Sequence, residues 1–506
     1  MVYTLRDLLQ RAGTTSNPKT AIVDGENRIH YPQLLDRVER AAFGLHANRI
    51  CKGDRVAIYL PRSVDAVVTL FAVWFVGAVA VFINDTLKTR QVNYILKHSG
   101  ASLLVTSDQL LASLHPPGVP EKNIRTVAQL DSPGPGGNSP GVIGEDLAMI
   151  IYTSGSTGLP KGIMLSHQNL LSGAMIVSDY LHLTSDDVLI SLLPFSFDYG
   201  LNQLLSSVFA GASLVIQQSL FPADICRCLI REQVTGMACV PLLWQQLAHP
   251  RSPFTKTHFP RLRYLTNTGG RMPESVTKLF RQAHPDVKIY LMYGLTEAFR
   301  SAYLEPEQVD IRPNSVGKAI PNVELLVVDE HGQPCKPGDP GELIHRGANI
   351  SLGYWNDPET TAKVFRPNPA VECRNGRPEI VVYSGDTFKT DDEGFLYFVG
   401  RKDAMVKSQG MRVSVEEIEN CVHASNLVSH VVAFAVDKNE VENEIIAAVV
   451  PHDATTFSEG DLMAYCKEEV PEYLRPKIVW TLSSLPQTSS GKPDRVALRE
   501  AYMRRT

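Results

Sequence analysis

Hydroxyl groups, glycines and one lysine are gathered in the stretch YTSGSTGLPKG, from Tyr152 to Gly162. Glycines in a loop that follows a strand allow several backbone N–H groups to point at one phosphate, while hydroxyls add donors and lysine adds positive charge. The stretch therefore predicts a phosphate-binding loop, with a flexible surface loop as the alternative for so short a pattern. The candidate phosphate contacts are Thr153, Ser154, Gly155, Ser156, Thr157, Gly158 and Lys161.

This stretch differs from the GxxxxGK[ST] loop of the P-loop nucleotidases. Counting on from Gly155, Pro160 stands where that loop needs its second glycine, and Gly162 stands where it needs a Ser or Thr to bind magnesium. The stretch therefore belongs to another class of phosphate loop, and alone it does not say whose phosphate is bound.

Further segments along the chain identify the class. They are YGLTE at 293–297, GELIHRGANISLGYW at 341–355, YSGD at 383–386, GRKDAMVKSQGMRVSVEEIE at 400–419 and SSGKPDR at 489–495. In this order, the segments resemble the signature motifs of the adenylate-forming superfamily: acyl-CoA synthetases, the adenylation domains of peptide synthetases, and luciferases. YGLTEAFRSAYLEPE also resembles a subgroup of bacterial acyl-CoA ligases encoded with exosortase-linked systems for surface polymers.

The resemblance implies that ATP activates a carboxylic acid as an acyl adenylate and that pyrophosphate leaves. Lys492 would be the catalytic cation, because negative charge builds on the α-phosphate as the acid attacks. Thr296 would donate a hydrogen bond to that phosphate, and Glu297 would hold Mg²⁺, which prefers oxygen ligands. The remaining ATP contacts implied are Gly269, Met292, Tyr293 beside adenine, Gly294, Asp386 on the ribose hydroxyls, and Arg401.

The second half of the implied chemistry transfers the acyl group to a thiol after the C-terminal domain rotates. The resemblance places the hinge at Asp403, with Gly410 and Arg412 on the face that meets the thiol arm. The thiol belongs to CoA or to a separate phosphopantetheinyl carrier protein, since the chain ends eleven residues after Arg495 and we expect no carrier domain to follow.

The expected acid pocket combines residues from two segments: Phe197, Asp198, Tyr199, Asn202 and Arg300. Phe197-Asp198 resembles the pair with which amino-acid-activating members hold the substrate ammonium group, and a partly buried carboxylate favours such a cation. Alternatively Asp198 faces solvent or caps a helix that begins near Tyr199, since Asp is a favoured N-cap. Arg300 would meet a second substrate carboxylate, pair with Asp198, or turn outward.

These alternatives leave several functions open. An amino acid is one candidate substrate, and a fatty- or aryl-acid CoA ligase with Asp198 outside the pocket is another. An adenylating oxygenase of the luciferase type would share the nucleotide residues, whereas a catalytically silent binding protein fits poorly with intact Thr296, Glu297, Asp386 and Lys492.

The elements that position these residues follow an α/β pattern. Residues 33 to 100 and 188 to 300 alternate helix-like stretches with short apolar runs, as in a largely parallel sheet. After about residue 315, closely spaced turn residues predict a small antiparallel β unit. We expect layered α/β sheets and this β unit in an adenylation core, residues 1–400, and a small, mobile α+β C-terminal domain, residues 401–506.

One apolar segment raises the question of a membrane. Ala66 to Ile83 is free of charge over eighteen residues, which is close to the length that spans a bilayer. A buried helix that leads through Gly77 into a buried parallel strand accounts for it equally well. Because neither a second span nor a flanking basic cluster accompanies it, we expect no membrane span.

Composition is that of an ordinary folded protein. The chain has 506 residues, of which 44% are hydrophobic and 20% charged, so more than one domain is expected. The net charge of -5 argues against nucleic acid as the main partner. Eight cysteines without CxxC or zinc spacing indicate reduced thiols, and the first residues lack a signal-peptide pattern, so we expect a cytoplasmic protein.

Overall fold

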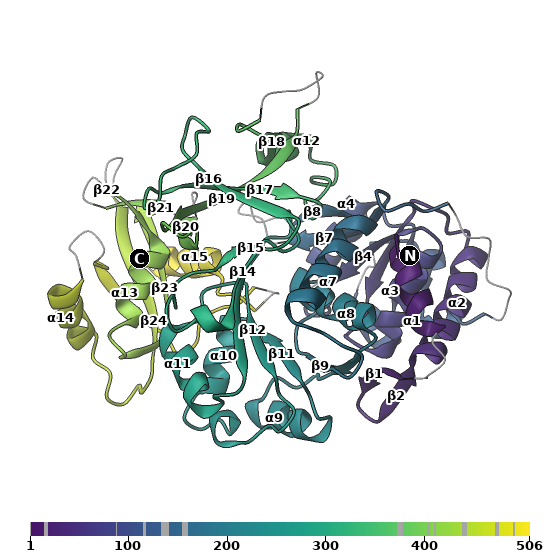
Figure 1. Cartoon of the computed structure of the whole chain (residues 1–506), viewed down its shortest axis with the longest axis horizontal. Helices are drawn as coiled ribbons and strands as arrows, with labels where there is room; N and C mark the ends of the chain where they lie inside the picture. The colour runs from purple at the N-terminus through teal and green to yellow at the C-terminus, as the bar shows by residue number, and fades with distance from the viewer. Residues whose placement is uncertain are drawn as a thin grey trace.

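The computed structural model describes residues 2–14, 19–87, 89–114, 118–132, 141–153, 160–371, 378–401, 405–408, 411–437, 443–470, 475–488 and 491–505. A large N-terminal domain of mixed α/β sheets is followed by a smaller C-terminal domain, which confirms the predicted fold class. In Figure 1 the chain runs from the purple N-terminal elements on one side, through teal and green, to the yellow C-terminal elements on the other. The division at residue 400 stays a prediction.

Two mainly parallel sheets form the large domain. The nine-stranded sheet has the order β15 (Lys318–Ala319), β14 (Ala302–Leu304), β13 (Lys288–Tyr293), β12 (Tyr264–Asn267), β11 (Gly236–Cys239), β9 (Val188–Ser191), β10 (Ser213–Ile216), β1 (Thr20–Asp24), β2 (Asn27–His30). The six-stranded sheet has the order β6 (Ile124–Arg125), β5 (Leu103–Thr106), β3 (Arg55–Tyr59), β4 (Val79–Ile83), β7 (Leu147–Thr153), β8 (Lys161–Ser166). The edge pairs β1–β2, β13–β14, β14–β15 and β7–β8 are antiparallel.

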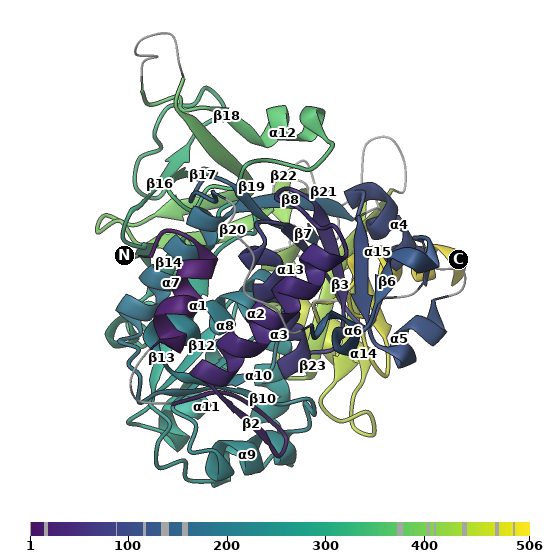
Figure 2. The ribbon, with the colours of Figure 1, turned by 90° about the vertical axis from the view of Figure 1, so that its right-hand side faces the viewer.

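Helices cover both sheets (Figure 2). The helices α1, α2, α3, α7 and α8 contribute buried faces to one hydrophobic core, and α4 packs on the six-stranded sheet in a second. The helices of this domain are α1 (Leu5–Gly13), α2 (Tyr31–Ala47), α3 (Val64–Phe75), α4 (Thr89–Ser99), α5 (Asp108–Ser113), α6 (Val127–Leu130), α7 (His167–Tyr180), α8 (Asp198–Ala210), α9 (Pro222–Arg231), α10 (Pro241–Ala248), α11 (Glu274–Ala283) and α12 (Pro358–Val364). Short 3₁₀ turns lie at η1 (Glu121–Asn123), η2 (Phe254–Lys256) and η3 (Pro306–Gln308).

The charge-free segment Ala66–Ile83 is a buried helix followed by a buried strand. Every residue of α3 from Ala66 onward is buried, Gly77 takes a positive φ of 70° at the turn, and all of β4 is buried. The parallel pairing of β4 with β3 and β7 explains why this strand has no polar face. In the part of the chain that the structure describes, no helix has both the length and the apolar character that crossing a membrane requires.

A small antiparallel β unit follows, as its closely spaced turn residues predict. Its strands are β16 (Val323–Val328), β17 (Gly341–Gly347), β18 (Phe365–Pro367), β19 (Ile380–Thr390) and β20 (Leu396–Arg401). Beyond it, β21 (Met405–Ser408) pairs with β22 (Met411–Ser414).

The C-terminal domain is built on a three-stranded sheet with helices on both faces. The alternation along β23 (Val428–Asp437) turns Val432 and Phe434 to one face and Ala433 to the other. One face packs on α13 (Val415–His423) and α14 (Glu459–Glu469), and the other on α15 (Arg495–Arg505). The sheet is completed by β24 (Asn443–Pro451) and β25 (Ile478–Thr481).

Candidate active site

A deep cleft lies where the parallel strands of the large domain end and the C-terminal domain begins. Segments that follow β4, β7, β9, β11, β12 and β13 line it from the large domain, while α13, β23 and the chain around Lys492 line it from the C-terminal domain. Ligands of open α/β sheets bind at such carboxyl ends. The cavity volume of about 2550 Å³ exceeds the roughly 300–1,000 Å³ of a pocket for one small ligand. The cleft therefore has room for a nucleotide and a second substrate together.

The ends of the predicted phosphate loop border this cleft. Thr153 is the last residue of β7 and pairs with Lys161, the first residue of β8. The Lys161 ammonium lies 3.4 Å from the Thr360 hydroxyl and 5.7 Å from the centre of the Tyr354 ring. Of the other loop candidates, Ser154, Gly155, Ser156, Thr157 and Gly158 lie outside the described residues.

The segment after β13 brings Thr296 and Glu297 into the cleft. The Glu297 carboxylate accepts a hydrogen bond of 2.6 Å from the Tyr354 hydroxyl. Burial raises the pKa of Tyr354 well above its ordinary value, and the negative charge of Glu297 raises it further, so this phenol stays a donor. The Thr296 hydroxyl lies 3.5 Å from the Asp198 carboxylate, to which it donates.

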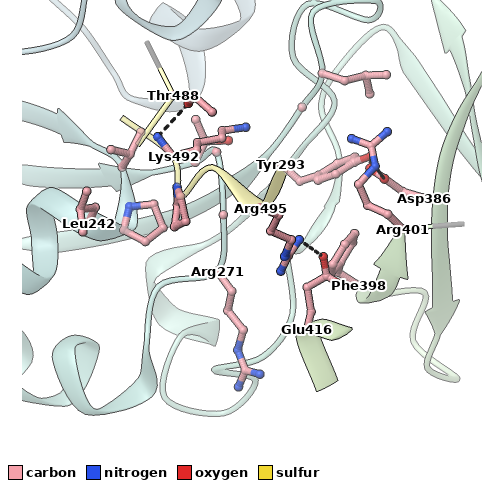
Figure 3. A pocket seen from close by; sticks show the side chains of 18 of the residues that line it. Leu242, Arg271, Tyr293, Asp386, Phe398, Arg401, Glu416, Thr488, Lys492 and Arg495 are labelled. Atoms are coloured by element: carbon pink, nitrogen blue, oxygen red, sulfur yellow. Dashed lines mark hydrogen bonds and ion pairs between the residues drawn. The ribbon is translucent and has the colours of Figure 1, made fainter. Parts of the chain in front are cut away.

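Tyr293, Asp386 and Arg401 form a group on another wall of the cleft. Tyr293 donates a hydrogen bond of 2.6 Å to Asp386, and the Arg401 Nε lies 3.4 Å from the same carboxylate. Figure 3 shows the Tyr293 side chain pointing toward Asp386 and Arg401. Desolvation, followed by the Asp386 charge, raises the pKa of Tyr293 well above its usual value. Met292 and Gly294, on either side of Tyr293, also line the cleft.

Lys492 extends from the C-terminal domain to the residues of the large domain at the bottom of the cleft. A methyl group placed on Gly269, which has a φ of 80°, would lie 3.4 Å from the Lys492 Cε and 3.8 Å from the Phe197 ring. Lys492 is accessible to water within the cleft. Desolvation by the surrounding protein lowers the pKa of its ammonium, and the carboxylates of Asp198, Asp386 and Glu297 act in the opposite direction.

Two hydrogen bonds connect Lys492 with Thr488. The Thr488 N–H donates to the Lys492 carbonyl at 2.7 Å. The Lys492 N–H donates to the Thr488 hydroxyl at 3.2 Å (Figure 3). Helix α15 begins three residues later, and its first residue, Arg495, forms ion pairs of 2.9 Å with Glu416 and 2.6 Å with Glu419 on α13. The lysine therefore sits between its contacts with Thr488 and an anchored helix.

Asp198 lines the cleft and is only 5% exposed. Both parts of the alternative interpretation are wrong: the side chain does not face solvent, and the N-cap of α8 is Phe197, with Asp198 the first helical residue. A carboxylate at this position is stabilised by the positive end of the helix dipole. This local field helps to explain how the acid is tolerated below the surface.

Of the other residues predicted for the acid pocket, two line the cleft and two lie behind its lining. Phe197 and Arg300 line the cleft, whereas Tyr199 and Asn202 lie behind the lining residues, at 3% and 2% exposure. The Tyr199 hydroxyl contacts Thr266 and the Met292 sulfur instead. Arg300 is buried rather than turned outward. The role of all of these residues in binding the acid stays a prediction.

The predicted hinge region is described only in part. Asp403 and Gly410 lie outside the described residues, and for Arg412 the structure places the backbone in β22, paired with Lys407. Hinge motion and the thiol-transfer face therefore stay predictions.

Three residues of this region were not assigned a role from the sequence. Tyr354 and Arg495 fall inside quoted motifs, GYW and SSGKPDR, so their motif membership was an available signal. His345 stacks beside Tyr293, with ring centres 5.9 Å apart, and is fully buried. It falls inside the same quoted motif as Tyr354, GELIHRGANISLGYW, so motif membership was an available signal for it as well.

Residues 9–355 match the family model described as AMP-binding enzyme. This chain belongs to the AMP-binding enzyme family. Residues 417–492 match the model of the AMP-binding enzyme C-terminal domain. The resemblance to adenylate-forming enzymes is thereby confirmed, while the finer subgroup of exosortase-linked ligases stays a prediction.

Curated relatives include two kinds of enzyme. Tyrocidine synthase 3 of Brevibacillus parabrevis is 30% identical over 504 residues, which cover 98% of this chain and 8% of that protein. The chain thus spans a small fraction of the length of such peptide synthases. Oxalate–CoA ligase of Arabidopsis thaliana is 28% identical over 525 residues and is covered over 99% of both chains.

Solved structures share the fold along nearly the whole chain. An anthranilate CoA ligase, AuaEII, in complex with anthranoyl-AMP superposes with a TM-score of 0.89 at 24% identity, covering 99% of this chain and 97% of that one. ATP-bound MatB from Rhodopseudomonas palustris superposes with a TM-score of 0.87 at 26% identity, covering 98% and 99%.

Proposed function

We propose that this family member is an ATP-dependent acid–thiol ligase, which forms an acyl adenylate with release of pyrophosphate and then passes the acyl group to a thiol. The observation that carries the proposal is the position of Lys492, which projects from the C-terminal domain to the Gly269–Phe197 floor of the cleft. Its ammonium is close enough to Asp198, Asp386 and Glu297 to be influenced by all three charges. A cation in this position is suited to stabilise the negative charge of two anionic reactants that must approach each other.

In the first step, a carboxylate oxygen bonds to the α-phosphorus of ATP and the bond to pyrophosphate breaks. Lys492 offsets the charge that builds on the α-phosphate oxygens, and Thr296 donates a hydrogen bond to them. Asp386, held by Tyr293 and Arg401, accepts hydrogen bonds from the ribose hydroxyls. Thr153, Lys161 and the glycine-rich loop between them hold the phosphates that leave.

The donor set fits a magnesium ion that is bound mainly by the nucleotide. Among the described residues, no three His, Cys, Asp or Glu side chains are grouped as a metal cage. Glu297 offers one carboxylate in the cleft, oriented by Tyr354. Mg²⁺ is typically bound by one or two carboxylates plus substrate phosphates, so Glu297 would hold it. When bound, the ion would neutralise charge on the phosphates.

The second step leaves the acceptor open between CoA and a separate carrier protein. A thiol sulfur bonds to the acyl carbon and AMP leaves, after rotation about Asp403 has brought Gly410 and Arg412 to the cleft. For the acid, the buried Asp198 carboxylate supports a substrate that carries an ammonium group, because a buried charge is costly without a counter-charge.

The test is exchange of labelled pyrophosphate into ATP, measured with a panel of fatty, aryl and amino acids. Exchange with at least one acid is expected, and Lys492→Ala should lower its rate at least about a hundredfold, the typical cost of losing one transition-state donor. Lys467→Ala, an exposed lysine of α14, is the matched control and should be neutral. An unchanged exchange rate in Lys492→Ala would overturn the proposed mechanism. An unaltered preference among acids in Asp198→Ala would overturn the proposed contact between Asp198 and a substrate ammonium group.

A further inference from the structure

Arg300 is a buried cation on the wall of the cleft. It follows Glu297 by three residues, lines the cleft, and is 3% exposed. Its Nε and Nη2 are buried and have no hydrogen-bond partner among the residues that the structure describes. A guanidinium is always charged and carries five N–H donors, so leaving it unpaired below the surface is costly.

Three partly buried arginines elsewhere in the described residues have polar partners for part of their guanidinium groups. Arg62 donates to the carbonyls of Ser191 at 2.6 Å and Gln217 at 3.1 Å. Arg312 and Arg495 are each paired with two carboxylates. Arg300 instead lies over aromatic rings, 4.9 Å from the Tyr199 centre and 5.5 Å from the Phe299 centre. Cation–π contacts hold the group in place but satisfy none of its N–H donors.

The backbone at Arg300 is held in an unfavourable conformation. Its φ of 101° is one that side-chain-bearing residues rarely adopt. The Asn349 amide donates to the carbonyls of Ala298 and Arg300 and fastens this turn. A methyl group on Gly294 would lie 3.3 Å from the Arg300 Cα and 3.7 Å from Nη1, so the guanidinium folds back past a glycine of the cleft. Strain of this kind is concentrated at ligand-binding sites.

The nearby carboxylates are engaged elsewhere. Among the described residues Arg300 forms no ion pair; Asp198, the other charged residue of the predicted acid pocket, accepts a hydrogen bond from Thr296 and influences Lys492. The alternative in which Arg300 pairs with Asp198 is therefore not seen in this structure. Arg300 thus lines the cleft with N–H donors that the described residues do not pair.

We infer that Arg300 binds a second carboxylate on the acid substrate, so that the natural substrate is a diacid whose far carboxylate meets the guanidinium while the near one is activated. This inference rests on the proposed function and narrows its substrate class. Bidentate hydrogen bonding of a carboxylate would satisfy the donors that the protein leaves unpaired.

The experiment compares acids that differ only in the far group, in pyrophosphate exchange: glutamate against glutamine, and succinate against succinamate. The wild-type protein should favour at least one diacid about tenfold or more in kcat/KM, as the loss of a charged hydrogen bond predicts. Arg300→Met should bring the ratio within each pair close to one, and Arg300→Lys should restore part of it. Because each ratio is taken within one variant, partial unfolding does not alter it.

Arg227→Met is the matched control, since among the described residues the ion pair of this exposed arginine is with Asp224 of its own helix, α9. Its ratios should equal the wild-type ratios. A wild-type preference for both amides, or a diacid preference that survives Arg300→Met, overturns the inference. If Arg300→Met lowers kcat/KM equally for both members of a pair, Arg300 contacts the activated carboxylate and the inference is overturned. If Arg300→Met raises only the KM for ATP, Arg300 contacts the nucleotide and the inference is likewise overturned.

Equilibrium binding separates this inference from the proposed function. Glutamate and succinate are titrated calorimetrically into the wild-type protein and Arg300→Met without ATP. Binding of the diacids that depends on Arg300, without any pyrophosphate exchange, would support the carboxylate site and refute the proposed ligase activity. Pyrophosphate exchange without a preference for diacids would support the proposed ligase activity and refute the carboxylate site at Arg300. Neither binding nor exchange with any acid would refute both.

Discussion

The Tyr354 hydroxyl donates a 2.6 Å hydrogen bond to Glu297, a residue 57 positions earlier in the chain. The same tyrosine ring lies 5.7 Å from the Lys161 ammonium at the end of the phosphate loop. Tyr354 thus connects the carboxylate proposed to hold magnesium with the loop proposed to hold the leaving phosphates. Since its raised pKa keeps the phenol protonated, the hydroxyl fixes the orientation of one carboxylate oxygen near neutral pH.

The first prediction concerns this contact. Tyr354→Phe removes one hydrogen bond and keeps the ring, so the Glu297 carboxylate loses its orientation and the magnesium concentration for half-maximal exchange should rise about tenfold, as for outer-shell partners of metal ligands. The measurement is exchange rate against magnesium at fixed ATP. Tyr465→Phe, in the C-terminal domain away from the cleft, serves as the control. An unchanged half-maximal concentration would contradict the link between Tyr354 and the metal.

The second prediction concerns Arg495, a positioning residue that acts through Lys492. Arg495 anchors the start of α15 to Glu416 and Glu419, three residues after the lysine. In Arg495→Met, the position of Lys492 should become less well defined. Because small misplacements cost about a hundredfold in rate, the kcat of exchange should fall far more than the KM for ATP rises. Arg495→Lys should recover part of kcat.

The control for that variant is Arg504→Met, since this exposed arginine lies on the same helix and pairs with Glu500. A merely structural role for Arg495 would lower the melting temperature and leave kcat per folded molecule unchanged. That outcome would argue against positioning.

The sequence predicts this architecture well where a local pattern carries the signal. The charge-free run up to Ile83 resolves into α3 and β4 because Gly77 permits a turn between them. The motifs likewise bring Tyr293 and Asp386, 93 positions apart, into hydrogen-bond contact. The first feature depends on a glycine whose positive φ the turn requires.

Side-chain environments were harder to predict because they depend on contacts between distant segments. A one-residue shift of the start of α8 decides whether Asp198 caps the helix or faces the cleft, and periodicity does not resolve one residue. For Arg300, the sequence left three orientations open, because its neighbours Tyr199 and Asn349 come from other segments. Local propensity contains no information about such contacts.

The last prediction concerns the dependence of stability on pH. His345 is fully buried beside Tyr293, neither ring nitrogen has a hydrogen-bond partner among the described residues, and desolvation lowers its pKa from 6.5 to about 3. Between these two values the unfolded chain binds a proton that the folded chain does not, so stability falls as the pH falls through this window. From pH 7.5 to pH 5, this one group should remove about 2 kcal/mol of stability.

His345→Phe keeps an aromatic ring beside Tyr293 and removes the titrating group and its unpaired nitrogens. The variant should therefore be at least as stable as the wild type at pH 7.5, and its advantage should be about 2 kcal/mol larger at pH 5. The measurement is the thermal unfolding midpoint at both pH values. Other buried histidines, such as His167, with its pKa lowered to about 4, titrate in the same direction in both proteins and cancel in the comparison. His331→Gln, at an exposed histidine, should follow the wild type. Equal losses for the wild type and His345→Phe would show that His345 is not the group responsible.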